Sequence, residues 1–140
     1  MNTRVAQVEI IIYKFINNEP LFLLLKRIPE KGGFWQPVTG GVHKNEGLSC
    51  AAKRELFEET QINNFINFLS NVHYFEFNDG TGMLKEYVYG VEIDKATDAK
   101  LSPEHSEKKW RTINHALNLL KYDNNKEAFK KLYKLLMTKD

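Results

Sequence analysis

The sequence has a single cysteine, no long hydrophobic run and almost no net charge, and each of these absences excludes a class of protein. Cys50 has no partner for a disulfide within the chain. No apolar run reaches the roughly 20 residues that a membrane-spanning helix needs, and the start MNTRVAQ lacks the apolar segment of a secretory signal. The formal net charge of +2 is too small to predict nucleic-acid binding. We therefore expect a cytoplasmic protein with neither membrane nor nucleic acid as a partner.

Composition and periodicity predict one α/β domain over residues 1–140. Hydrophobic residues make up 42% and charged residues 27% of the 140, which is ordinary for a globular protein. Strands are expected at 5–15, 21–26, 34–39, 65–77, 84–93 and 108–112. Helices are expected from Leu48 through Glu59, at 114–120 and at 126–136, the last burying Leu132, Leu135 and Leu136. Helices that interleave with hairpins predict a mixed sheet covered by helices.

An acidic cluster interrupts the apolar face of the first helix. At about 100° per residue, one broad face is apolar in its first two turns and carries Glu55, Glu58 and Glu59 in its last two, while Thr60 and the small residue Cys50 lie away from these carboxylates. Carboxylates at this spacing repel one another, and partial burial at a helix C-terminus increases the cost. A bound divalent cation removes the conflict, and oxygen ligands favour Mg²⁺ or Mn²⁺. The alternative is a solvated acidic helix end. If the cluster is buried, Glu59→Gln is expected to remove most activity and leave the fold intact or more stable.

Residues 40–62 resemble the Nudix box, G-x5-E-x7-R-E-U-x-E-E-x-G-U, in which U is an aliphatic residue. The positions that match are Gly40, Glu46, Arg54, Glu55, Leu56, Glu58, Glu59 and Ile62. Gln61 stands where the box has a glycine, which normally closes the helix in a left-handed conformation. We expect the helix end to fray or the turn to move to Asn63 or Asn64. The resemblance extends over nearly the whole chain and implies an α/β/α sandwich.

The resemblance also implies a metal-assisted attack of water on phosphorus. The carboxylates of the box would hold the metal ions, and one carboxylate would accept the proton of the attacking water. Arg54 is expected to pair with Glu46 and so hold the loop against the helix, which makes it an orienting residue. Gly40 and Gly41 would let the backbone and the substrate pass close to the metal site.

A second segment, at residues 102–110, carries Glu104-His105 followed by Trp110. It resembles a segment of two Nudix groups in which the glutamate reaches the metal site as ligand or base, and this implies the same role for Glu104. A histidine such as His105 is more often a structural hydrogen-bonding residue. Glu86 and Glu107 are weaker candidates for the same role.

Residues 34–40, FWQPVTG, are similar to the run F-W-Q-x-V-T-G of bacterial dihydroneopterin triphosphate pyrophosphatases, also described as dATP pyrophosphohydrolases. This group often lacks the last glycine of the box as well. Trp35, beside Gln36 at the mouth of the box, is the best candidate for a contact with the base or pterin ring, although a single aromatic residue more often packs in a core.

Residues 120–128 are similar to the S-N-(K/R)-x-A helix start of the same group. Asn124 and Asn125, at the N-terminus of the expected helix, and Lys126 could meet a phosphate or a base. The simpler interpretation is that the lysines in this part of the chain face solvent on the surface of a helix.

Together these resemblances imply a Mg²⁺-dependent pyrophosphohydrolase that cleaves a nucleoside or pterin triphosphate to the monophosphate and pyrophosphate. Diadenosine tetraphosphate hydrolases share the Glu-His…Trp segment and are the first alternative. A catalytically idle nucleotide-binding module is the second, and the complete set of box carboxylates argues against it. The pattern leaves open the substrate's ring, the number of metal ions, the general base and the oligomeric state.

Overall fold

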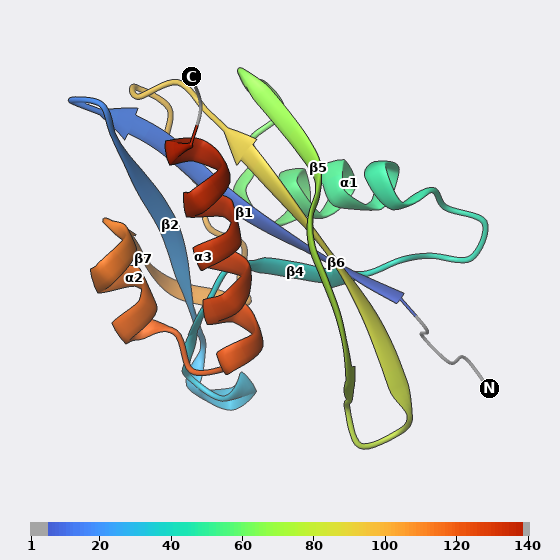
Figure 1. The fold of residues 1–140 in the computed structure, drawn as a ribbon. Coiled ribbons are helices and arrows are strands. Elements are labelled where there is room, and N and C mark those ends of the chain that lie inside the picture. The colour runs from blue at the N-terminus through green and yellow to red at the C-terminus, as the bar shows by residue number, and fades with distance from the viewer. Residues whose placement is uncertain (1–5, 139–140) are drawn as a thin grey trace.

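The computed structural model describes residues 6–138, in which seven strands form one mixed sheet with helices on both faces (Figure 1). The strands are β1 (Ala6–Ile16), β2 (Glu19–Arg27), β3 (Trp35–Gln36), β4 (Val38–Gly41), β5 (Asn67–Asn78), β6 (Met83–Glu92) and β7 (His105–Arg111). The helices are α1 (Leu48–Thr60), α2 (Ile113–Leu119) and α3 (Asp123–Met137), with a 3-10 turn η1 at Pro29–Lys31. α1 covers one face, and α2 and α3 cover the other, which confirms the predicted α/β/α sandwich. None of the helices among these residues is long and apolar enough to cross a membrane.

Strand β1 lies at the centre of the sheet, whose order is β3-β2-β1-β6-β5. It runs parallel to β6 along one edge, and along the other it pairs antiparallel first with β4 and then with β2. Its sequence is a nearly continuous apolar run with β-branched residues, which is typical of strands buried on both faces. The central position of β1 explains why it touches both hydrophobic clusters described below.

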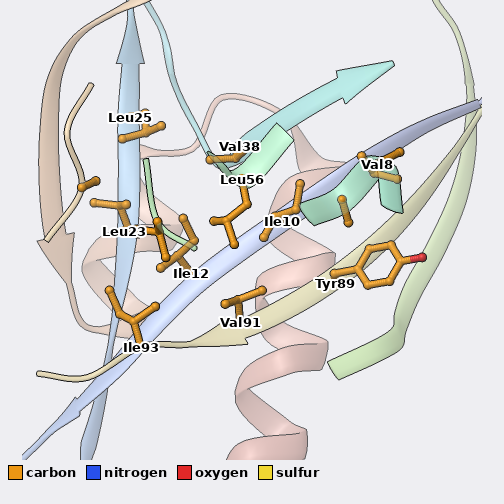
Figure 2. Packing of buried hydrophobic residues seen from close by; sticks show 14 residues of the cluster. Val8, Ile10, Ile12, Leu23, Leu25, Val38, Leu56, Tyr89, Val91 and Ile93 are labelled. Atoms are coloured by element: carbon orange, nitrogen blue, oxygen red, sulfur yellow. The ribbon is translucent and has the colours of Figure 1, made fainter. Parts of the chain in front are cut away.

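Side chains of β1 alternate between two hydrophobic clusters. Ile10 and Ile12 lie in the cluster under α1, where Leu56 packs beside them (Figure 2). Ile11 lies in the second cluster, under α2 and α3. Each fully buried aliphatic side chain contributes about 1.5–3 kcal/mol relative to exposure. Because successive residues of a strand point to opposite faces, the odd-numbered positions of β1, including Glu9, belong to the α3 side.

Two predicted strand boundaries are wrong. Residues 34–39 form two strands rather than one, because Pro37 has no N–H for the ladder and separates β3 from β4. β7 begins at His105, earlier than the expected 108, and pairs with β2 through an irregular register at its start. The earlier start places His105 in the sheet rather than in a loop.

The helix ends and surfaces also differ from expectation at particular residues. Gln61 itself takes the left-handed conformation, with φ of 61°, and its N–H donates to the Phe57 carbonyl at 2.8 Å, so the helix neither frays nor moves its turn. Cys50, expected to pack, is exposed. Leu135, expected to be buried, has 53% of its surface exposed because α3 turns this position away from the sheet.

Candidate active site

A cavity of about 780 Å³ extends from α1 and β4 across the face of the sheet that α3 covers. This volume lies within the range of small-molecule sites, roughly 300–1,000 Å³. We call the part formed by Gly40, Glu55 and Glu59 the α1 side of the cavity. The part formed by Gln7, Glu86 and Asn125 is the α3 side.

Glu55 is a buried carboxylate of the α1 side that lies against Gly40. It is 8% exposed, and a Cβ added to Gly40 would overlap its carboxyl group, so the glycine leaves the space in which this carboxylate lies. Burial raises the pKa of Glu55, and repulsion from Glu58 and Glu59 adds to the effect, while Arg54 opposes it. Glycine is therefore needed at position 40 because any larger residue would displace the Glu55 carboxylate.

Arg54 connects the loop before α1 to the helix. Its Nε and Nη2 donate to the two carboxylate oxygens of Glu46 at 2.8 and 3.0 Å, and Nη2 also donates to the Gly41 carbonyl at 2.8 Å. Its Nη1 donates to Glu55 at 2.8 Å. The two-point contact lowers the pKa of Glu46 to about 2. The geometry agrees with the predicted pairing of Arg54 with Glu46 and with an orienting role.

Glu59 contacts the side chains of Ser102 and His105, which lie more than 40 residues later in the sequence. The Ser102 hydroxyl donates to Glu59 Oε1 at 2.6 Å. His105 Nδ1 lies 3.3 Å from the same oxygen, close enough for attraction although the hydrogen bond is not well aligned. The imidazole, and after it the Ser102 hydroxyl, lower the pKa of Glu59 against the effect of burial. Gln36 places its amide nitrogen 3.1 Å from His105 Nε2, which makes Nε2 the acceptor and puts the ring proton on Nδ1, toward Glu59.

The other two predicted metal ligands, Glu58 and Glu104, are more exposed than Glu55 and Glu59. Glu58 was expected on the inward face and Thr60 outward, but the Glu58 side chain is 52% exposed and Thr60 is buried, because the inward face of α1 is narrower than predicted. Glu58 accepts from Arg54 at 3.1 Å. Glu104 lines the cavity with a side chain 47% exposed, and its carboxylate lies 3.6 Å from Lys31 Nζ and 3.9 Å from Arg27 Nη2.

Two of the four predicted metal ligands, Glu55 and Glu59, line the cavity together. Among residues 6–138, no three histidine, cysteine or acidic side chains gather closely enough to hold a metal ion by themselves. Mg²⁺, however, usually binds one or two carboxylates and takes its remaining ligands from water and substrate phosphates. Glu55 and Glu59 are hard oxygen donors, face the same cavity and act on each other electrostatically. The donor chemistry of this pair suits Mg²⁺ or Mn²⁺, and Glu104 also lines the cavity.

Gln36 and Gly41 line the cavity as predicted for substrate-binding residues, but Trp35 and Lys126 are not among the described residues that do so. Alternation along β3 turns Gln36 inward and leaves Trp35 against the second hydrophobic cluster, where Lys109 Nζ lies 4.9 Å from its ring centroid. Lys126 Nζ lies 3.9 Å from an Asp123 carboxylate oxygen instead. Gln36 lines the cavity instead of Trp35, and Asn125 lines it instead of Lys126.

Several residues of the cavity wall were missed from the sequence. Four aromatic rings line it, from three separate segments: Phe34, Phe75, Phe77 and Tyr122. Phe34 and Tyr122 meet edge to face at 5.4 Å. Two cations, Arg27 and Lys31, line the cavity beside Glu104. Only two of these rings could have been suspected from the sequence, because Phe34 lies next to Trp35 and Tyr122 lies close to Asn124.

Comparisons with known proteins agree with this geometry. The NUDIX domain family matches residues 5–134. The chain is 32% identical over 126 residues to an octanoyltransferase of Myxococcus xanthus, covering 89% of this chain but only 35% of that protein. It is 30% identical over 135 residues to a dihydroneopterin triphosphate diphosphatase of Haemophilus influenzae, covering 87% of this chain and 83% of that protein. The solved Ap4A hydrolase of C. elegans, a binary complex, superposes with a TM-score of 0.84 at 22% identity, covering 96% and 99% of the two chains, a likeness that shows the fold.

Proposed function

The chain belongs to the NUDIX domain family, and on that premise we propose that it cleaves a nucleoside or pterin triphosphate to the monophosphate and pyrophosphate in a Mg²⁺-dependent reaction. The hydrolase relatives support the predicted enzyme class. The observation that carries the proposal is the pair Glu55 and Glu59, two buried carboxylates that face a nucleotide-sized cavity. The similarity to the Haemophilus diphosphatase supports a triphosphate as the substrate.

Glu55 and Glu59 would hold the metal, and Glu58 and Glu104 could join them by turning from their present cationic partners. Bound there, Mg²⁺ or Mn²⁺ would neutralise phosphate charge and stabilise the oxyanion that develops when the bridging oxygen leaves. A carboxylate of this group accepts the proton of the attacking water. Arg54 keeps Glu55 in place, since it is anchored at the same time to the loop before α1.

The cations at the rim suit the phosphate chain of the substrate. Arg27 and Lys31 line the cavity beside Glu104, and Nε of Arg27 is buried without a hydrogen-bond partner among the described residues. Arginine and lysine supply charge-assisted hydrogen bonds to phosphate oxygens. In our proposal they bind the phosphates and leave Glu104 free to turn toward the metal.

Two other functions remain as alternatives. A diadenosine tetraphosphate hydrolase is favoured by the likeness to the C. elegans enzyme, which extends over nearly both chains. An idle nucleotide-binding module would not need the ion pairs that orient Glu55 or the donors that hold Glu59, and both sets are in place. The triphosphate is preferred because the relative that supports it is also the more similar in sequence.

Turnover of a substrate panel tests the proposal. Purified protein is given dATP, dGTP, dihydroneopterin triphosphate and diadenosine tetraphosphate with Mg²⁺, and pyrophosphate and monophosphate are measured. We expect release of pyrophosphate from at least one triphosphate faster than cleavage of the tetraphosphate, with no turnover in the presence of a chelator. The Glu59→Gln protein controls for contaminating phosphatases. Faster cleavage of diadenosine tetraphosphate would favour that alternative, and silence across the panel would favour the idle module.

A further inference from the structure

The Glu59 carboxylate uses its two oxygens unequally. Its Oε1 accepts a hydrogen bond from the Ser102 hydroxyl at 2.6 Å and lies 3.3 Å from His105 Nδ1. Among the residues that the structure describes, both of these side-chain contacts fall on Oε1. Glu59 also lines the cavity, so its second oxygen, Oε2, is the one that a ligand in the cavity can use.

The His105 ring can donate to Glu59 in only one of its two neutral forms. A neutral imidazole carries its proton on one nitrogen and accepts at the other. The Gln36 amide nitrogen, which only donates, lies 3.1 Å from Nε2, so Nε2 is the acceptor. The proton is then on Nδ1, which faces a carboxylate oxygen that only accepts. Gln36 and Glu59 therefore require the same tautomer of the ring that lies between them.

The partners of Glu59 are held by regular structure. Gln36 and His105 are each 7% exposed, and they lie on β3 and β7, two strands that both pair with β2. The Ser102 N–H donates to the Glu59 backbone carbonyl at 3.3 Å, which joins the segment before β7 to the end of α1. The donors that face Oε1 are thus fixed by the backbone as well as by their side chains.

Neutral donors on Oε1 suit a cation better than a charged partner would. The terminal torsion of a glutamate is broad, and donors on one of its oxygens restrict that rotation. Ser102 and a neutral His105 add no positive charge, so the carboxylate keeps its full attraction for a metal ion. Outer partners of this kind orient metal ligands in proteins generally, and their loss reduces metal affinity or activity by about 10–100-fold.

We propose that Gln36 and Ser102 are positioning residues for Glu59. Ser102, through its hydroxyl, and Gln36, through the tautomer of His105, reserve Oε1 for the protein and leave Oε2 to hold the metal ion. The proposal rests on the metal site of the proposed function and adds two residues to it. Gln36, which the sequence placed among the substrate-binding residues, thereby acts through His105 instead.

The first test measures metal binding without turnover. Mn²⁺ is titrated into substrate-free protein, and the free ion is followed by its electron paramagnetic resonance signal. We expect Ser102→Ala to weaken Mn²⁺ binding by about tenfold or more, and Ser102→Thr, which keeps the hydroxyl, to restore it. Gln36→Met is the independent variant, because the Ser102 hydroxyl also accepts from the Glu104 N–H at 3.3 Å; it should weaken binding to a similar extent.

Ser106→Ala is the matched control for metal binding. Ser106 is exposed and follows His105 on the same strand, so this variant should bind Mn²⁺ as the unmodified protein does. Unchanged affinity in both Ser102→Ala and Gln36→Met would overturn the proposal, and so would an unmodified protein that binds no Mn²⁺.

The second test examines the tautomer of His105 directly. Nitrogen NMR of metal-free protein with labelled imidazoles at pH 7 distinguishes a ring protonated at Nδ1 from one protonated at Nε2 or at both. Loss of its signals in His105→Gln assigns them among the four histidines. We expect the Nδ1–H form in the unmodified protein and a mixture in Gln36→Met. Any other form in the unmodified protein, or the same spectrum in the variant, would overturn the role of Gln36. If Gln36→Met fails to fold, the spectrum of the unmodified protein still decides the tautomer.

Turnover separates a positioning role from contact with the substrate. With the triphosphate that the panel identifies, Gln36→Met and Ser102→Ala should lower kcat by about tenfold when Mg²⁺ is limiting and leave KM for the triphosphate nearly unchanged. A raised KM with unchanged Mn²⁺ affinity would mean that Gln36 contacts the substrate, and the proposed function would stand without the positioning role. If no triphosphate is hydrolysed but both variants weaken Mn²⁺ binding, the proposed function fails and the positioning role stands.

Discussion

The two sides of the cavity bury carboxylates by opposite means. On the α1 side, Glu55 meets Arg54, and Glu59 meets a hydroxyl and an imidazole, so positive or donating groups keep these charges in place. On the α3 side, Glu9 meets an amide and a second carboxyl group. The result is a lowered pKa for Glu59 and a strongly raised pKa for Glu9.

This difference indicates which side of the cavity suits a bound cation. An ionised carboxylate with donor support suits a cation and the phosphates that accompany it. A carboxyl group whose pKa is raised well above its usual range, as that of Glu9 is, carries a negative charge less readily and suits a cation less well. Under the proposed function the α1 side holds the metal and the phosphates, so we expect its variants to change kcat, and variants of the aromatic and cationic residues elsewhere in the cavity to change KM.

The largest effect is expected from Glu59→Gln on the α1 side. We expect kcat to fall roughly a hundredfold or more, because the charge that faces the metal and phosphate is lost. The sequence alone predicts an unchanged or higher stability for this variant. The structure predicts a lower one: a carboxyl whose pKa is lowered by folding adds stability at pH values above its unfolded pKa, and the amide cannot. Glu55→Gln should lose activity similarly but remain as stable or gain stability, because folding raises the pKa of Glu55.

Turnover with saturating Mg²⁺ and urea unfolding at pH 7 measure both quantities. Glu76→Gln, a substitution at an exposed carboxylate that accepts from Tyr74, is the control and should change neither. Near-normal kcat in the Glu59→Gln protein would remove this carboxylate from the reaction. A higher stability of that protein would show that repulsion, rather than support by Ser102 and His105, dominates at this position.

The next effect concerns the acid stability that Arg54 confers. The pKa of Glu46 falls from the usual 4.5 to about 2 in the folded protein. The stabilisation is therefore complete above pH 4.5 or so and is lost as the pH falls toward 2. In Arg54→Met, the dependence of unfolding free energy on pH should flatten in this window, and kcat should fall about 10–100-fold as Glu55 loses its orienting partner.

Urea titrations between pH 7 and pH 2 provide the measurement. Lys130→Met is the matched control, since its ion pair with Glu127 is exposed and such pairs contribute little. An unaltered acid limb in Arg54→Met would mean that other carboxylates account for the loss of stability in acid.

The same comparison shows what the sequence could and could not predict. The pairing of Arg54 with Glu46 follows from residues eight apart, within one loop and one helix, so local spacing was sufficient. The α3 side of the cavity, formed by Gln7, Glu86 and Asn125, depends on the pairing of β1 with β6 and on where α3 packs, and no local pattern contains that information. Asn125 and Glu86 were named as candidates from the sequence, but nothing there indicated that they would line the same side of one cavity.

Two predicted contact residues lie one position away from the residues that line the cavity. Trp35 was predicted to contact the ring and Lys126 to meet a phosphate or a base, but the cavity is lined by their neighbours Gln36 and Asn125. The register of a two-residue strand and the rotation of a helix at its first turn are set by tertiary packing, because propensities do not distinguish adjacent positions. Gln61 shows the converse case, since a glutamine adopts the left-handed turn that the pattern reserves for glycine.

A moderate effect should distinguish Tyr122 from Trp35. Tyr122→Leu removes an aromatic wall of the cavity and is expected to raise KM by about 3–10-fold with little loss of stability, because Tyr122 is 48% exposed. Trp35→Leu should lower the unfolding free energy and leave KM nearly unchanged, since Trp35 packs against the second hydrophobic cluster. Steady-state kinetics and thermal unfolding on both variants decide the matter. A raised KM in Trp35→Leu would restore the ring contact predicted from the sequence.

The smallest effect is expected from Lys126→Met. At 100° per residue, a turn that directs Asn125 into the cavity directs the next side chain away from it, and Lys126 lies 3.9 Å from Asp123 instead. KM should stay within about twofold of the unmodified value, because an exposed ion pair contributes little. Lys31→Met is the informative partner variant: Lys31 lines the cavity, so its loss should raise KM several-fold and weaken the dependence of KM on salt. Equal changes in the two variants would mean that the phosphate chain extends to the start of α3 as well as to the cations beside Glu104.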